Sequence, residues 1–331
     1  MNPDFPRPEI GAIHIRPPSA HMPNPLPSLL KLRIYMGRSP EYIDGWPHNA
    51  PRSCNSRVTA RRAPLWNAGG VGYALESMAA SETALPPPKV RIGISSCLLG
   101  QEVRYNGGHK RDDFLVGTLG PFVEWVPVCP EVELGMGVPR PAIRLERIGG
   151  DVRLRMPSTG EDLTDAMRDF SRRRVEDLAA MSLDGYVLKK DSPSCGMEKV
   201  KIYRGAGAPS KDGRGVFAET LVARLPHLPV EEEGRLKDPK LRENFITRVF
   251  VHHSWQEGEK EGWTRAGLIR FHERHKLLLM ARNQSAVRRL ETLLDEASRS
   301  GSVRDLVIEY REGLTEILSR PATRRGQRGL V

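Results

Sequence analysis

Residues 185–197 read "GYVLKKDSPSCGM", an apolar run followed by a Ser/Pro/Gly loop that carries a cysteine. The compact run is typical of a buried strand, and the loop residues are typical turn formers. Cys195 is therefore expected just beyond the carboxyl end of a strand, as an oriented thiol. Cys97 and Cys129 have the same setting, because they follow strand-like runs at 89–96 and 124–128.

The chain between residues 89 and 235 alternates strand and helix patterns. Residues 142–156 alternate polar and apolar side chains about a Gly-Gly pair, which predicts a β-hairpin. Residues 159–181 and 215–225 have apolar side chains at helical spacing, and residues 199–204 read as a further strand. Strands that alternate with helices predict an α/β domain with a mostly parallel sheet, whose site is formed by loops at strand carboxyl ends.

Residues 1–88 differ in composition from the rest of the chain. They hold 15 of the 27 prolines and show no sustained hydrophobic periodicity. Such a segment cannot bury enough apolar surface to offset its chain entropy, so we expect a largely disordered extension. Cys54 lies in it and is expected to have no role. Met78 opens a short leader into the first strand, and we expect the authentic protein to start at or near it.

Residues 228–244 read as a polar linker with an Asp-Pro pair as a breaker. Beyond it the chain is helical in pattern, with helices expected at 241–255, 264–283, 286–297 and 303–319. We therefore predict a smaller all-α domain at 238–319, followed by a basic tail at 320–331.

The net charge of +10 raises the question of nucleic-acid binding. Residues 1–88 carry +3 of it and the tail at 320–331 carries +4, so most of the excess lies at the two ends. Nucleic acid is therefore the weaker partner prediction, and no recognition motif supports it. No apolar stretch reaches the ~20 residues of a membrane span. Four cysteines in 331 residues do not make a disulfide scaffold, which favours a cytoplasmic, reducing setting.

Three thiols after three parallel strands can meet, although they are 32 and 66 residues apart in sequence. The chemistry that uses three converging thiolates is soft-metal binding, by zinc or by an iron–sulfur cluster. The Cys-x-x-Cys pairs of ordinary zinc modules are absent, which favours a cluster. The alternative is that two or three of these cysteines are small buried thiols.

The motifs around these cysteines resemble one known family. The segments "SSCLLG", "RYNGGHK", "VPVCPEVELGMGVPRP", "GEDLT", "KKDSPSCGM" and "GVFA", within residues 89–225, are similar to those of the thiouracil desulfurases. The resemblance implies a [4Fe–4S] cluster on Cys97, Cys129 and Cys195, with one iron open to the substrate sulfur. It also implies removal of sulfur from a thiolated pyrimidine without net redox change.

The helical part resembles the YbgA-type domain that commonly follows this module. The resemblance rests on "RENFITRVFVHHSW" and "FHERHKLLLMA" at 242–255 and 271–281. Members of that family continue with further helices where this chain ends in "RPATRRGQRGLV", so we interpret the helical domain as truncated.

Hydrolytic desulfuration needs water at the carbon that bears sulfur and proton transfers to and from it. Glu131 and Glu133, just past Cys129, and Asp191, four residues before Cys195, are the acid/base candidates, of which Glu131 is preferred. Ser194 is a further candidate catalytic residue, as a donor to the cluster or to the base edge. Each of these residues is also an ordinary turn former or cap.

Four more residues are candidates for substrate binding. Tyr105 and Asn106 lie in a glycine-rich loop that could close over a flat ring, and Tyr105 could stack on it. Arg140 is a planar donor that could face an oxo group or a phosphate, or form a surface salt bridge instead. Ser192 could bind the base edge.

These patterns predict a cytoplasmic enzyme that cleaves a carbon–sulfur bond in a small thiolated heterocycle. The rival hypothesis is a non-catalytic iron–sulfur or zinc-binding regulator, whose helical domain contacts a partner or nucleic acid. Iron or zinc content separates the two metals, and a carboxylate needed near the cluster separates an enzyme from a sensor.

Overall fold

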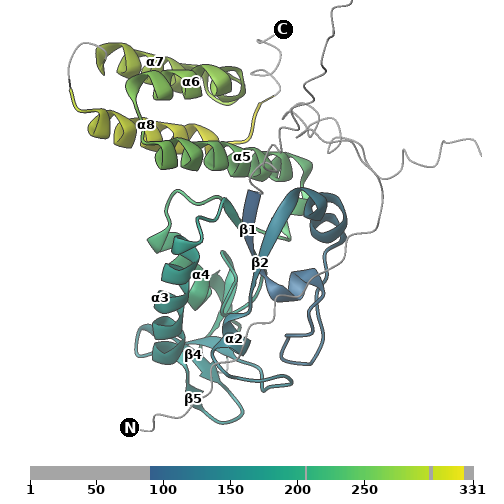
Figure 1. The fold of residues 1–331 in the computed structure, drawn as a ribbon. Coiled ribbons are helices and arrows are strands. Elements are labelled where there is room, and N and C mark those ends of the chain that lie inside the picture. Colours follow the sequence, from purple (N-terminus) through teal and green to yellow (C-terminus); the bar gives the residue numbers. More distant parts are fainter. Residues whose placement is uncertain (1–89, 206, 298–300, 324–331) are drawn as a thin grey trace, which may run out of the picture. The chain divides into compact units, whose positions relative to one another are not determined.

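The computed structural model describes residues 90–205, 207–297 and 301–323 (Figure 1). The expectations for residues 1–88, including those for Cys54 and Met78, lie outside the described residues, as does most of the basic tail. Within the described part, the predicted α/β fold class with a parallel sheet and a helical region after it is confirmed. No helix in those residues is long and apolar enough to cross a membrane.

The first sheet is entirely parallel and has the strand order β2-β1-β6-β9. Its strands are Val123–Val128 (β2), Val90–Ser95 (β1), Gly185–Leu188 (β6) and Val230–Glu232 (β9). The first two of these predicted strands pair directly, Val90 opposite Val123 and Ser95 opposite Val128. This in-register pairing brings the carboxyl ends of β1 and β2 to the same edge.

Strand β9 was not expected, because its residues fall in the segment interpreted as a polar linker. It pairs parallel to β6, with Tyr186 opposite Val230 and Leu188 opposite Glu232. The glutamates of this strand are buried. The interpretation of residues 228–244 as a linker is therefore wrong at its start. It is also wrong at its end, because a helix begins at Pro239 and includes residues 239–244.

A second, five-stranded sheet has the order β5-β4-β3-β7-β8. Its strands are Glu161–Asp162 (β5), Asp151–Met156 (β4), Arg144–Ile148 (β3), Val200–Tyr203 (β7) and Ser210–Gly213 (β8). The predicted hairpin is confirmed, because β3 and β4 pair antiparallel around the Gly149-Gly150 turn. The strand predicted at 199–204 belongs to this mixed sheet rather than to the parallel one.

Helices α3 (Thr164–Ala180) and α4 (Val216–Arg224) pack on one face of the parallel sheet. Tyr186 of β6 is fully buried there, with its ring centroid 6.0 Å from that of Phe217. The neighbouring strand makes room for this ring: a Cβ on Gly93 would lie 2.3 Å from Tyr186 Cδ2. A glycine is therefore required at position 93 by the close approach of β1 and the tyrosine.

Four helices follow, as the sequence predicts: Pro239–Glu261 (α5), Arg265–Met280 (α6), Gln284–Ala297 (α7) and Val303–Leu318 (α8). Asp238 caps α5, since its carboxylate accepts from Lys240 N at 2.7 Å. Helix α5 contacts β1 and β6, and its Val249 side chain approaches Gly185.

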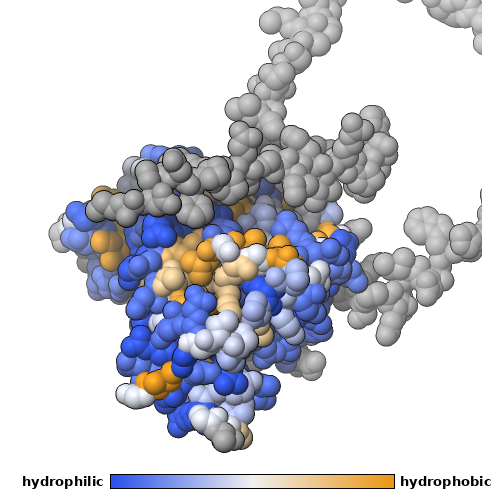
Figure 2. All heavy atoms as spheres, turned by 90° about the horizontal axis from the view of Figure 1, so that it is seen from below, coloured by the Kyte–Doolittle hydropathy of each residue, from blue (hydrophilic) through white to orange (hydrophobic). Residues whose placement is uncertain are grey.

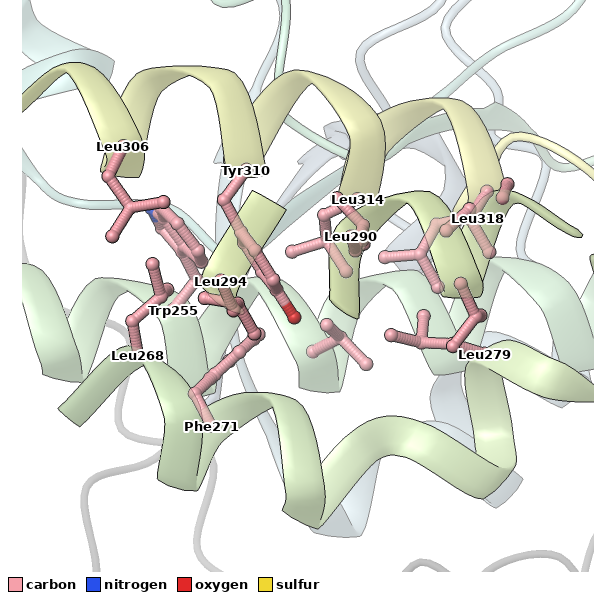
Figure 3. Close-up of a cluster of buried hydrophobic side chains, with 14 residues drawn as sticks. Trp255, Leu268, Phe271, Leu279, Leu290, Leu294, Leu306, Tyr310, Leu314 and Leu318 are labelled. Atoms are coloured by element: carbon pink, nitrogen blue, oxygen red, sulfur yellow. The ribbon is translucent and has the colours of Figure 1, made fainter. Parts of the chain in front are cut away.

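The four helices share one hydrophobic core (Figure 3). Trp255 of α5 stacks on Tyr310 of α8 with ring centroids 6.0 Å apart, and meets Phe271 of α6 edge-on at 5.4 Å. The histidines of "FHERHK" belong to this core rather than to a metal site. His272 lies 3.0 Å from the Tyr310 hydroxyl through Nδ1, and His275 is buried beside Phe271.

Candidate metal centre and active site

The three cysteines follow three adjacent strands of the parallel sheet. Cys97 comes after β1 in a short 3-10 turn, Cys129 comes directly after β2, and Cys195 lies in the loop after β6. All three are free thiols. Cys97 and Cys195 are buried, and Cys129 is partly exposed. The loops at the carboxyl edge of the sheet therefore present three thiols on the same side of the fold.

Electrostatics shows that the thiols lie close enough to affect one another. Burial, opposed by the Lys189 charge and assisted by the Cys129 charge, raises the pKa of Cys97 to about 11. Burial is also the main cause of the raised pKa values of Cys129 and Cys195, and Cys97 and Cys129 add to the effect on Cys195. Three thiolates in this site need a cation to balance them, because mutual repulsion and burial both favour the neutral thiols.

The donor set fits an iron–sulfur cluster. Among the residues that the structure describes, no three His, Cys, Asp or Glu side chains are grouped as ligands of a single metal ion. A cluster makes a different demand, because its cysteine ligands bind different iron atoms. Three free, buried or half-buried thiols without a histidine partner match that demand, since thiolate is the usual protein ligand of such clusters.

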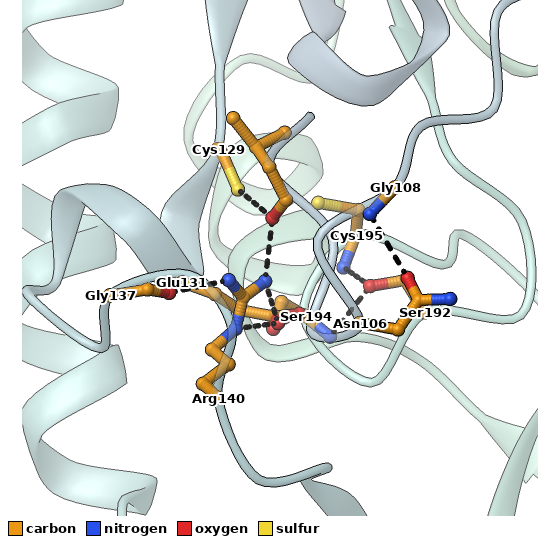
Figure 4. Close-up of polar contacts among 10 residues, drawn as sticks. Asn106, Gly108, Cys129, Glu131, Gly137, Arg140, Ser192, Ser194 and Cys195 are labelled. Atoms are coloured by element: carbon orange, nitrogen blue, oxygen red, sulfur yellow. Dashed lines mark hydrogen bonds and ion pairs between the residues drawn. The ribbon is translucent and has the colours of Figure 1, made fainter. Parts of the chain in front are cut away.

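Glu131 and Ser194 meet beside these thiols (Figure 4). Glu131 lies in the short helix α2 (Pro130–Glu133) immediately after Cys129, and Ser194 precedes Cys195. The Ser194 hydroxyl donates to Glu131 Oε1 at 2.9 Å and is fully buried. The two loops that carry Cys129 and Cys195 are thus joined by a direct hydrogen bond between two of the predicted site residues.

Arg140 holds the other oxygen of the same carboxylate. Its Nη2 and Nε donate to Glu131 Oε2 at 2.6 and 3.0 Å, and the arginine of this pair is buried while the glutamate is partly buried. The remaining donors go to the backbone carbonyls of Gly137 and Val103, each at 2.9 Å. The structure shows a salt bridge for Arg140, with the arginine buried rather than at the surface: the guanidinium donates to protein acceptors through all three of its nitrogens and orients Glu131.

The Val103 carbonyl links this network to a thiol. It accepts from Arg140 and, at 3.8 Å, from the Cys129 thiol (Figure 4). The backbone N–H of Cys129 donates in turn to Glu133 Oε1 at 3.0 Å. Cys129 is therefore held from two sides, by the loop after β1 and by its own helix α2.

Ser192 shapes the loop that presents Cys195. Its hydroxyl accepts from the backbone N–H of Ser194 and of Cys195, at 3.3 and 3.1 Å. The Ser194 carbonyl accepts from the first amides of α4, and Gly215 allows this approach: a Cβ there would lie 2.4 Å from that carbonyl. The role of Ser192 in the structure is to cap this turn.

Asp191, Tyr105 and Asn106 lie farther out. Asp191 has a positive φ of 59°, and its side chain is 71% exposed beside Lys190. Tyr105 is 45% exposed, with the Arg104 guanidinium 5.5 Å from its ring centroid. Asn106 is exposed and accepts from Gly108 N within a tight turn. The structure thus brings Glu131, Ser194 and Arg140 together and leaves Asp191 outside that network.

Two buried glutamates of the unexpected strand β9 and its end also serve the site. Glu233 accepts from Lys189 Nζ at 2.6 Å and from Lys190 N at 2.7 Å, and Glu232 accepts from Met197 N at 2.7 Å. They clamp both ends of the loop that carries Cys195. The charge of Lys189 also lowers the pKa of Cys97, so this lysine faces the thiols.

The sequence offers only a weak signal for these residues. A run of three glutamates is typical of a solvated segment, and nothing in its spacing marks a buried strand. The one available clue is Val230 and Leu228 just before it, which supply apolar residues for a short strand.

Comparison with known proteins agrees with this organisation. Residues 92–233 match the family described as 2-thiouracil desulfurase, and residues 276–329 match a family of unknown function, DUF1722. The uncharacterized protein YbbK of Bacillus subtilis is 33% identical over 136 residues, which are 39% of this chain and 88% of that protein.

A second relative and one solved structure are also similar to this chain. The uncharacterized protein YbgA of Escherichia coli is 28% identical over 83 residues, 25% of this chain. This chain spans about half the length of YbgA, 49%. A solved structure described as the [4Fe-4S]-dependent thiouracil desulfidase TudS is 32% identical, with a TM-score of 0.37, covering 46% of this chain and 97% of that one.

The family match covers all three cysteine loops and the Glu131 network, and it defines an enzyme that cleaves carbon–sulfur bonds. The chain belongs to the 2-thiouracil desulfurase family through its α/β part, and its helical part has YbgA-like relatives.

Proposed function

We propose that this enzyme removes sulfur from a thiolated pyrimidine by hydrolysis. A thiocarbonyl and water give a carbonyl and hydrogen sulfide, so the reaction has no net redox change and needs no electron donor. The observation that carries this proposal is the arrangement of three free thiols with a partly buried carboxylate held between two of their loops. The family match supports the substrate class.

Cys97, Cys129 and Cys195 would hold a [4Fe–4S] cluster. When bound, the cluster supplies a Lewis-acidic iron without a protein ligand, which can take the substrate's sulfur. The chain's own part is to present three thiolates on one side of the sheet and to exclude bulk water from two of them. The Lys189 ammonium adds positive charge beside Cys97, which favours the thiolate.

Glu131 is the general base in this proposal. Its Oε1 is the oxygen that meets the Ser194 hydroxyl, and its Oε2 is occupied by Arg140. The proton of the attacking water therefore passes to Oε1, either directly or through the hydroxyl of Ser194, whose own proton points at the carboxylate. Arg140 fixes the orientation of Glu131 and is a positioning residue.

The decisive test joins cluster content to chemistry. The full chain is reconstituted anaerobically, and iron, acid-labile sulfide and zinc are measured before incubation with 2-thiouracil. About four iron and four sulfide per chain are expected, together with sulfide and uracil in equal amounts. Stoichiometric zinc would contradict the proposal, and so would a complete cluster without sulfide release; either result would favour a metal-binding regulator.

A further inference from the structure

A cavity lined by both apolar and basic side chains lies away from the cysteine loops. It is formed by residues 226–229, which lead into β9, together with α5 and α8. Its volume is about 70 Å³. The side chains that line it include two arginines, two histidines and two hydroxyl residues: Arg248, Arg311, His227, His252, Thr315 and Ser319.

This cavity is distinct from the candidate active site. Pro229 precedes β9, and the His252 imidazole lies beside the backbone of Leu183, which precedes β6. The cysteines instead follow their strands. Because β6 and β9 are parallel, the cavity lies at the amino edge of the sheet and the cysteine loops lie at the carboxyl edge.

The lining of the cavity is basic. None of its lining residues, all within the described part of the chain, carries a carboxylate. Arg311 is paired with Glu259, which lies outside the lining. No hydrogen bond or ion pair joins the Arg248 guanidinium to another residue that the structure describes. Glu231 is within electrostatic range of Arg248 but pairs with Arg235 at 2.6 Å.

The charged forms of the basic groups in the lining are disfavoured, as their lowered pKa values show. Burial lowers the pKa of Arg248 and of Arg311. Burial and then the Arg311 charge lower the pKa of His252 to about 4, and the same two causes lower the pKa of His227. Arg248 is half-buried without a carboxylate partner among the described residues, beside a second arginine and two histidines of lowered pKa, so an anion that enters the cavity stabilises it.

Size and donor chemistry point to one class of anion. One water molecule needs roughly 10–15 Å³ of such space, so this cavity has room for a small polyatomic anion such as a tetrahedral phosphate. Guanidinium groups bind phosphate oxygens in a two-donor fork, and Thr315 adds a hydroxyl 3.2 Å from His227 Nδ1.

We propose that this cavity between the α/β part and helices α5 and α8 binds a phosphate group, with Arg248 as its principal ligand. The group can be inorganic phosphate or the phosphate of a nucleotide, since the lining recognises the oxyanion. Because the site contacts both the segment before β9 and two helices of the helical part, phosphate stabilises the packing of the one on the other.

The test is a titration of the full chain in chloride buffer at constant ionic strength and pH 7, followed by ³¹P line broadening and heat. Inorganic phosphate is one arm and uridine 5′-monophosphate is the other. We expect saturable binding in at least one arm and a rise of about 10-fold or more in the dissociation constant for Arg248→Gln. Comparable binding in both arms identifies a phosphate site, and tighter binding of the nucleotide identifies a site for a larger ligand.

The matched control is Arg270→Gln, which removes an exposed arginine from α6 and has to leave the affinity unchanged. Arg248→Lys keeps the charge without the fork, and it is expected to bind several-fold more weakly than the wild type even if the Gln variant does not fold. The proposal is overturned if neither probe binds saturably, or if Arg248→Gln and Arg248→Lys both bind as the wild type does.

Discussion

The Ser194 hydroxyl donates a 2.9 Å hydrogen bond to Glu131, 63 residues earlier in the chain. Glu131 lies two positions after Cys129, and Ser194 directly precedes Cys195. This bond therefore joins the two cysteine loops. It also places Glu131 Oε1 beside the thiols, where this oxygen can accept a proton. The catalytic proposal depends on this contact.

Glu131→Gln tests the base directly. Gln keeps the size of the side chain and can still accept from Ser194, but it is a far weaker proton acceptor. We expect sulfide release from 2-thiouracil to fall by about 10²–10⁴-fold while iron content stays the same. The control is Glu102→Gln, an exposed carboxylate in the loop after Cys97. Full activity in Glu131→Gln with an intact cluster would remove Glu131 from the mechanism.

Substitutions of Arg140 test whether it positions the Glu131 carboxylate. Removing one partner of a buried ion pair costs roughly 3–5 kcal/mol, so Arg140→Met is expected to destabilise the chain toward urea. Arg140→Lys keeps the charge but loses the fork that holds Glu131 Oε2. A lower kcat with little change in KM is expected for the Lys variant. A raised KM at constant kcat would show instead that Arg140 binds substrate.

Gly93→Ala tests the packing behind the site. The added Cβ would lie 2.3 Å from the Tyr186 ring, which is enclosed by α3 and α4 and cannot retreat. We expect a loss of about 1–3 kcal/mol in the free energy of unfolding. Gly117→Ala is the matched control, because nothing lies within 4 Å of its added Cβ. Equal stability of the two variants would contradict the packing described here.

The contact between His253 of α5 and Asp184, which precedes β6, makes the stability of the fold depend on pH. Asp184 lies 3.1 Å from His253 and raises the pKa of His253 above its usual 6.5, with Glu257 adding to the effect and Lys260 opposing it. Because the pKa of His253 is raised in the folded state, its protonation stabilises the fold. This stabilisation is fully present below about pH 6.5 and is lost as the pH rises through the pKa of the folded state.

His253→Gln removes that contribution. The difference in unfolding free energy between wild type and His253→Gln is therefore expected to be larger at pH 5.5 than at pH 8.5. Urea titrations at the two pH values measure it. The pKa values of His252 and His227 are lowered rather than raised, but both residues are present in both proteins, so their contributions to the difference cancel. A difference that grows toward pH 8.5 would contradict the contact.

The sequence predicts the parallel sheet and the three cysteine loops because each strand is an apolar run that ends in turn-forming residues. It does not predict β9, where Glu232 and Glu233 are buried by partners that belong to the loop after β6. Such burial depends on backbone amides brought there by the fold, and no spacing along the chain encodes it.

The same limit applies to individual site residues. Arg140 lies nine residues from Glu131, and its pairing follows from how the loop at 135–140 folds back on α2. Asp191 is close to Cys195 in sequence, yet its left-handed backbone conformation turns it to the surface. Proximity in sequence identified candidates, and only the fold separates those that meet from those that do not.

The most direct test of the central claim is the metal content of Cys97→Ala, Cys129→Ala and Cys195→Ala beside the wild type, all reconstituted anaerobically and assayed with 2-thiouracil. We expect about four iron and four sulfide in the wild type, a deficient cluster in each variant, and sulfide release by the wild type alone. Iron content and sulfide release that survive all three substitutions would contradict it.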